Sequence, residues 1–190
     1  MKLLTVATSL GLLTAGPLSA NEFAAAMEAF YQSEIADLAT DQTLIDAVAA
    51  QNRETSGFSL ADIEALDQTW RAEVGTSSTP TITPVLENAA ADVLRSHVAS
   101  FGGRITEIFV MDAQGLNVAA SDVTSDYWQG DEAKHSETFG VGADAVHFSE
   151  VELDESTQRY QGQISFPIVD PATNTPIGAI TVGVDADALM

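Results

Sequence analysis

The sequence contains no cysteine and few basic side chains. The absence of cysteine excludes disulfides, thiolate metal sites, a cysteine nucleophile and a lipid-modified cysteine anchor. Its 7 lysine and arginine residues stand against 28 aspartate and glutamate residues, which gives a formal net charge of -21. Nucleic acid is therefore an unsuitable partner, because phosphate binding requires clustered basic side chains. An anionic membrane surface would repel the chain for the same reason.

The sequence also lacks an apolar run of the about 20 residues that a membrane-spanning helix needs. Its first apolar stretch, Leu3–Leu13, follows Lys2 and ends before a Gly-Pro pair and the small residues Ser19 and Ala20. This pattern is typical of a secretory signal peptide, which we place at residues 1–20. A membrane anchor is the alternative, disfavoured by length. We expect the mature protein to be periplasmic or secreted.

The overall composition fits one globular domain. Of the 190 residues, 45% are hydrophobic and 18% are charged, which is enough apolar material to build a core. The acidic surface favours cationic partners through long-range attraction, although salt screens exposed charges within about 10 Å. A simpler alternative is a surface adapted to a saline exterior.

The first half of the mature chain has the periodicity of helices. Apolar residues recur at helical spacing from Phe23 to Leu38, and Asp41 is placed to cap a further helical stretch. We predict one long N-terminal helix, kinked near Asp41, that ends at about Asn52.

Two more helices are predicted before the strands begin. Ser59 is a suitable N-cap for the second helix, because acidic residues and an apolar face follow it. The third helix is expected from about Pro84 to Ser100, where a glycine pair ends it.

After that glycine pair, the hydrophobic pattern becomes that of strands. Ile105–Met111 is apolar on both faces apart from Glu107, which predicts a central strand. Asp112–Gly115 is a turn, so Leu116–Ala120 is expected to return as the second strand of a hairpin.

The clearest alternation lies between Thr157 and Val169. It predicts a strand with one core face, which includes Tyr160, and an opposite face that carries Arg159 and Gln161. Further strands are expected at Val146–Val151 and Ile177–Val184.

These elements predict an α+β fold of one domain. We expect a helical region at residues 21–102 and an antiparallel sheet of five strands at residues 103–190. The helices pack on this sheet.

Five segments resemble the extracytoplasmic PAS-like sensor domains called Cache or PDC domains. The resemblance extends over nearly all of the mature chain, and the order and spacing of the segments carry it more than any single motif does. The segments are Ile105–Gly115, Asn117–Ser121, Thr124–Glu132, Phe166–Asp170 and Pro176–Ile180.

The resemblance implies a long N-terminal helix on a five-stranded antiparallel PAS-like sheet, with a small-molecule pocket on the other side. Most such domains are bracketed by membrane-spanning helices and signal to a module inside the cell. Because this chain stops at Met190, we expect a stand-alone, secreted, single-Cache domain. Its protein partner would be a membrane sensor kinase, a cyclase or a chemoreceptor.

The loop that follows the first hairpin is the main candidate for a ligand site. Asp126 stands beside Tyr127 and Trp128, and Asp131 follows a glycine. A carboxylate next to aromatic planes suits an amine, through charge pairing and cation–π attraction. The alternative is that the two aromatic side chains plug the sheet and the carboxylates cap local structure.

Arg159 and Gln161 extend this candidate site from the strand with the clearest alternation. An arginine binds a carboxylate in a bidentate pair, so the site as a whole would suit an amino-acid-like or amine-containing ligand. The alternative is that this polar row faces water.

Enzymatic function is not expected. Asp131, Glu132 and His135 are spaced like helical metal ligands, but no second histidine stands near them, so we predict no metal. No Gly-x-Ser-x-Gly motif and no phosphate-binding loop is present, so we predict no catalytic residue and no cofactor. A hydrolase that uses Asp126, Asp131 or His135 is the least supported alternative. A structural protein that forms a homodimer through its first helix, without a ligand, is the stronger one.

Overall fold

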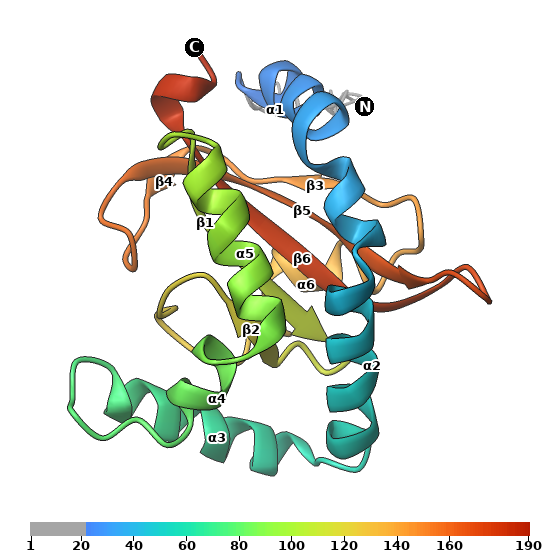
Figure 1. Ribbon diagram of the computed structural model, residues 1–190, viewed down its shortest axis with the longest axis vertical. Helices are drawn as coiled ribbons and strands as arrows, with labels where there is room; N and C mark the ends of the chain where they lie inside the picture. Colours follow the sequence, from blue (N-terminus) through green and yellow to red (C-terminus); the bar gives the residue numbers. More distant parts are fainter. Residues whose placement is uncertain (1–21) are drawn as a thin grey trace, which may run out of the picture.

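The computed structural model describes residues 22–190. The predicted signal peptide lies outside these residues. Within the described part of the chain, no helix combines the length and the apolar character that crossing a membrane requires. Helices α1, α2 and α5 lie on one face of a twisted sheet, and α3 and α4 lie at one end of the molecule (Figure 1).

The predicted long N-terminal helix is a series of shorter pieces. The chain runs through α1 (Ala24–Phe30), a π-helical turn (Tyr31–Ile35) and a 3₁₀ turn (Ala36–Thr40) before α2 (Gln42–Thr55). The break occurs at Asp41, as predicted: its backbone is extended, and its carboxylate accepts hydrogen bonds from the backbone N–H groups at the start of α2, at 2.8 and 3.2 Å.

The second predicted helix is α3 (Leu60–Glu73), and its expected cap is confirmed. Ser59 accepts from the backbone N–H of Asp62, while the Asp62 carboxylate accepts from the backbone of Ser59, so the pair forms a capping box.

The prediction of one helix from Pro84 to Ser100 is wrong. The segment forms α4 (Ile82–Leu86) and α5 (Ala89–Ser100). Asn88 causes the break, because its side chain accepts a hydrogen bond from Ala91 N at 2.8 Å and so caps a new helix.

The sheet is antiparallel throughout, with the strand order β2-β1-β6-β5-β3, and β4 pairs with β5 beside β3. It has six strands and not five: the segment expected at Val146–Val151 contains only the short strand at 147–148, and the strand at 152–153 was not predicted. The strands are β1 (Ile105–Asp112), β2 (Asn117–Ala120), β3 (His147–Phe148), β4 (Glu152–Leu153), β5 (Tyr160–Asp170) and β6 (Thr175–Asp185). The short helix α6 (Ala133–Ser136) stands between β2 and β3, and a 3₁₀ turn (Ala186–Ala188) follows β6.

The sheet is buried on both faces. On the helix face, the apolar side chains of β1, β5 and β6 pack with α1, α2 and α5 in one hydrophobic cluster. On the opposite face, which we call the cavity face, Phe109 and Met111 of β1 pack with Trp70 of α3 and Val85 of α4. These two layers confirm the predicted α+β architecture of helices on an antiparallel sheet.

Tyr160 is not a core residue, contrary to the prediction from the alternation of β5. Tyr160 is 63% exposed, and Leu153, its partner on the neighbouring strand β4, is 52% exposed. The helix layer reaches only the next residue of this face, Gly162, where Met27 of α1 approaches so closely that a Cβ would lie 1.8 Å from its methyl group. Tyr160 lies beyond that cover, at the end of the strand.

Candidate functional site

The cavity face of the sheet has a polar floor. Ser165 of β5 and Thr181 of β6 are fully buried and share a hydrogen bond of 2.9 Å. Gln161 of β5 donates from Nε2 to Oε1 of Glu107 on β1, at 2.7 Å. Since buried polar groups are costly unless they are paired, this floor is built from matched partners on neighbouring strands.

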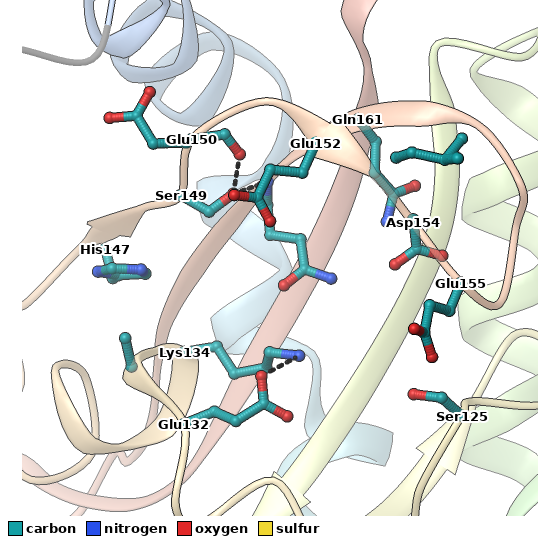
Figure 2. A pocket seen from close by; sticks show the side chains of 13 residues that line it. Ser125, Glu132, Lys134, His147, Ser149, Glu150, Glu152, Asp154, Glu155 and Gln161 are labelled. Carbon is teal, nitrogen blue, oxygen red and sulfur yellow. Dashed lines mark hydrogen bonds and ion pairs between the residues drawn. The ribbon is translucent and has the colours of Figure 1, made fainter.

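A cavity of about 330 Å³ lies over this face, between α6 and the segment that carries β3 and β4. In Figure 2, Glu132 and Lys134 lie on one side, and Ser149 and Glu152 lie on the other. Five carboxylates line the cavity together with hydroxyl, amide and imidazole groups, which makes its wall strongly acidic. The carboxylate and ammonium side chains of the wall are Glu132, Lys134, Glu150, Glu152, Asp154 and Glu155.

Lys134 contributes the one lysine or arginine side chain of this wall. Its Nζ donates to Oε1 of Gln129 at 3.0 Å and pairs with Oε2 of Glu132 at 3.1 Å. The same Nζ lies 5.5 Å from the ring centroid of Phe109, in cation–π geometry. An ammonium group is therefore already held here by an aromatic face, an amide oxygen and a carboxylate.

Each of the three loop residues predicted to bind a ligand has a partner within the fold. Asp126 pairs with Arg71 of α3 at 3.1 Å, Tyr127 stacks on Trp70 of the same helix, and Trp128 donates from Nε1 to the carbonyl of Gln114 at 2.9 Å. The carboxylate of Asp67 on α3 also accepts the backbone N–H groups of Tyr127 and Trp128, at 2.9 and 3.1 Å. The loop is thereby anchored to α3.

The other three predicted residues differ in their surroundings. Asp131 is exposed, and Arg159 pairs with Asp185 and donates to the carbonyl of Gly103 at 3.3 Å. Gln161 is 3% exposed and is the one predicted site residue that lines the cavity. A ligand role for all six predicted residues, Gln161 included, stays a prediction.

Burial perturbs two carboxyl groups of this region. Desolvation, together with the nearby charge of Glu132, raises the pKa of Asp126, although Lys134 and Arg71 oppose the shift. Desolvation and the charge of Asp154 raise the pKa of Glu107, which is 4% exposed. Both groups retain a proton to a higher pH than a solvated carboxyl would.

Sequence reasoning missed most of the cavity wall. No ligand role was assigned from the sequence to Lys134, Asp154 or Glu155, which line the cavity. A signal was present in the run from Glu150 to Glu155, which places four acidic residues within six positions shortly before the strand that forms the floor. Within residues 22–190, no group of three or more histidine, aspartate or glutamate side chains is arranged to hold a metal ion.

No protein-family model matches the sequence, and no curated protein matches it at a significant level. The fold has similar solved structures. The ligand-binding domain of the Campylobacter jejuni chemoreceptor Tlp3, in complex with 4-methylisoleucine, is 11% identical with a TM-score of 0.43, over 85% of this chain and 64% of that one. The sensor domain of the V. cholerae histidine kinase DctB is 15% identical with a TM-score of 0.39, over 89% and 57%.

The sensor domain of E. coli DcuS is a third similar structure, 15% identical with a TM-score of 0.39, over 78% of this chain and 96% of that one. This chain spans less than two thirds of the Tlp3 and DctB domains. Each of these three structures is a sensor domain or a ligand-binding domain.

Proposed function

We propose that this protein is a periplasmic or secreted sensor module that binds a small molecule and signals through a membrane sensor kinase, a cyclase or a chemoreceptor. The observation that carries the proposal is the cavity of about 330 Å³ on the polar face of the sheet. A volume of this size suits a metabolite, since small-molecule sites in proteins run from about 300 to 1,000 Å³.

The charge of the wall supports an amine-containing ligand. Carboxylates at Glu150, Glu152 and Glu155 line the cavity without any lysine or arginine paired to them among the described residues. A ligand with an ammonium group would neutralise part of this charge. Lys134, at the α6 side, is placed to meet an anionic group of the same molecule. An amine or an amino-acid-like molecule therefore fits the wall best.

The proposal does not include catalysis. The side chains that line the cavity present no nucleophile activated by a neighbouring base, and His147, the one histidine among them, pairs with Glu137 at 3.4 Å. The protein would act by binding, and the ligand shifts the conformational equilibrium only by as much as its affinities for the two arrangements differ.

A thermal-shift screen of amines, amino acids, betaines and small carboxylates tests this function. A ligand at 100 times its Kd should stabilise the protein by about 2.7 kcal/mol and raise the melting temperature accordingly. We expect amines and amino acids to give the shift and simple carboxylates to give none.

Two charge-neutralising variants provide the control. Glu152→Gln changes the cavity wall and should weaken binding of the hit about tenfold or more, because it removes a charged partner. Glu64→Gln makes the same charge change on the exposed side of α3, away from the cavity, and should bind like the wild type. If no compound class shifts the melting temperature and the chain forms a concentration-dependent dimer, the alternative of a ligand-free structural protein gains support instead.

A further inference from the structure

The turn between β4 and β5, residues 154–157, is organised by the Asp154 carboxylate. Its Oδ1 accepts the backbone N–H groups of Ser156 and Thr157, at 3.0 and 2.8 Å, and the Ser156 hydroxyl at 2.6 Å. Burial disfavours the charge of Asp154, but the hydrogen bonds from Ser156 and Thr157 outweigh burial and lower its pKa. Asp154 is therefore the ionised acceptor of the turn.

The turn rests on a second carboxyl group, which comes from the centre of the sheet. Glu107 of β1 accepts from Gln161 through Oε1, and its Oε2 lies 3.1 Å from the hydroxyl oxygen of Ser156. The Ser156 hydroxyl thus stands between the carboxyl groups of Glu107 and Asp154.

The single Ser156 hydrogen lies within reach of two acceptors, Oδ1 of Asp154 and Oε2 of Glu107, and a proton on Glu107 would satisfy both contacts. A serine hydroxyl carries a single hydrogen, and the shorter contact, at 2.6 Å, assigns it to Asp154. The Ser156 oxygen then presents a lone pair to Oε2 of Glu107. A deprotonated Glu107 would oppose it with another lone pair, whereas a protonated Glu107 donates to it. The satisfied chain of donors runs from Glu107 to Ser156 to Asp154.

No neighbouring group replaces this proton. Gln161 donates its amide to the other Glu107 oxygen, and its own oxygen accepts from the hydroxyl of Thr106. The charged groups that face Glu107 come from the turn, from the segment after β2, from α6 and from α3. They are Asp154, Glu155, Asp122, Lys134 and Arg71. Burial and the charge of Asp154 raise the pKa of Glu107. The hydrogen bonds from Gln161 and Ser156 and the charge of Lys134 stabilise its ionised form but do not outweigh these two effects.

The turn also separates two cavities. Asp154 and Glu155 line the cavity described above, and Glu155, Ser156 and Thr157 line a second cavity of about 460 Å³ whose wall includes Glu107. Ser125 and Glu155 belong to both walls. The turn therefore lies where the two cavities adjoin.

We propose that protonated Glu107 is the positioning residue that fastens the turn 154–157 to the sheet, and that loss of this proton frees the turn and joins the two cavities. The proton leaves to solvent, and Ser156 keeps its bond to Asp154. This inference concerns the chain alone and does not depend on any ligand.

Carbon-13 NMR of glutamate-labelled protein tests the proposal in a titration from about pH 4 to about pH 9. One side-chain carboxyl signal, identified by its absence in Glu107→Gln, should titrate with a midpoint above the ordinary value of 4.5. The backbone amide signals of Ser156 and Thr157 should move with the same midpoint.

Glu107→Gln is the conservative variant that separates this role from a merely structural one. A glutamine at this position still accepts from Gln161 and donates to the Ser156 oxygen, so it imitates the protonated carboxyl. We expect the Ser156 and Thr157 amide signals of this variant to stay near their low-pH wild-type positions across the whole titration. A merely structural role would disturb these signals at every pH.

Ser156→Ala breaks the chain of donors and leaves Glu107 in place. In this variant the Thr157 amide should no longer follow the titration of Glu107. The proposal is overturned if the Glu107 midpoint lies at or below 4.5, or if the turn amides stay fixed while Glu107 titrates. Should Glu107→Gln fail to fold, the Glu107 carboxyl signal is assigned by through-bond correlation to its own backbone, and the wild-type titration and Ser156→Ala then decide the question.

Discussion

The rings of Trp70 and Tyr127 stack with centroids 5.3 Å apart and planes inclined by 14°. Trp70 belongs to α3, and its Nε1 donates to the carbonyl of Thr124 at 2.9 Å. Burial raises the pKa of Tyr127 to about 12, so its ring stays neutral in the stack. The loop after β2 and the helix α3 are therefore one structural unit, although more than 50 positions separate them in the sequence.

Truncation of Trp70 should be among the most destabilising changes in this unit. Trp70→Ala removes a fully buried indole and should lower the free energy of unfolding by about 3–5 kcal/mol. Trp70→Phe keeps an aromatic partner for Tyr127 but loses the hydrogen bond from Nε1. It should lower the free energy of unfolding by about 1 kcal/mol for that bond, with a smaller additional cost in packing. Urea denaturation measures both. Equal losses in the two variants would show that the stack contributes nothing.

Gly115 should tolerate no side chain. Its φ is +83°, and a Cβ there would lie 2.4 Å from the Cα of Gly130, a backbone atom that cannot move aside easily. Gly102 is the matched control, because its φ is +59° and a Cβ there meets nothing within 4 Å. Gly102→Ala should cost about 1–2 kcal/mol from backbone strain alone. Gly115→Ala should cost clearly more, and thermal denaturation of the two variants would reveal a similar loss if the close approach were unimportant.

Asp112 should be the most sensitive polar residue of the first hairpin. It is fully buried, and its carboxylate accepts from Gln51 at 3.1 Å, from Thr55 at 2.8 Å and from two backbone N–H groups of the turn, each at 2.9 Å. Asp112→Ala leaves these donors without their acceptor and should cost more than about 3 kcal/mol.

Thr55→Val is the control for Asp112, because it removes one donor and retains the carboxylate. Its expected cost is about 1 kcal/mol in the free energy of unfolding. A cost for Asp112→Ala no greater than that of Thr55→Val would contradict the view that one carboxylate joins α2 to the hairpin.

His135 should make the protein less stable in acid. Burial lowers the pKa of its imidazole, and this outweighs the hydrogen bond of 3.1 Å to the backbone carbonyl of Asp112 and the charge of that residue. The unfolded chain therefore binds the proton more readily than the folded one does. The stability that His135 contributes is present above its ordinary pKa of 6.5 and is lost as the pH falls through the lowered value.

His135→Phe isolates this effect, since it keeps a ring next to Phe139 and cannot titrate. Between about pH 7.5 and about pH 5, the wild type should lose more free energy of unfolding than the variant, as measured by chemical denaturation. The remaining titratable groups are common to both proteins. Parallel pH profiles would mean that His135 is not held neutral by the fold.

Local chemistry in the sequence was sufficient to predict the caps and the first hairpin. Ser59 and Asp41 cap the helices that they were expected to cap, because capping depends on residues within one turn. The Asp112–Gly115 turn joins β1 to β2 for the same reason. The break at Asn88 was missed because asparagine inside an otherwise helical pattern gives only a weak signal.

The polar pairs on the cavity face of the sheet could not be predicted from the sequence. Alternation in β5 predicts one apolar face, but it does not reveal that Ser165 and Thr181 are opposite each other and hydrogen bonded. Arg159 was likewise expected near a ligand, and Asp185, which pairs with it, becomes its neighbour only through the register of β5 and β6. Polar residues are assigned to solvent or to a core only when their partners are known.

Strand β1 separates two hydrophobic clusters, because its side chains alternate between the two faces of the sheet. Ile108 and Val110 face the helices, while Glu107, Phe109 and Met111 face the other layer. Because consecutive residues of one strand are rigidly linked, a tilt of β1 that relieves crowding on one side must repack the other. A displacement of β1 on the cavity face would therefore reach the helices across the thickness of a single strand.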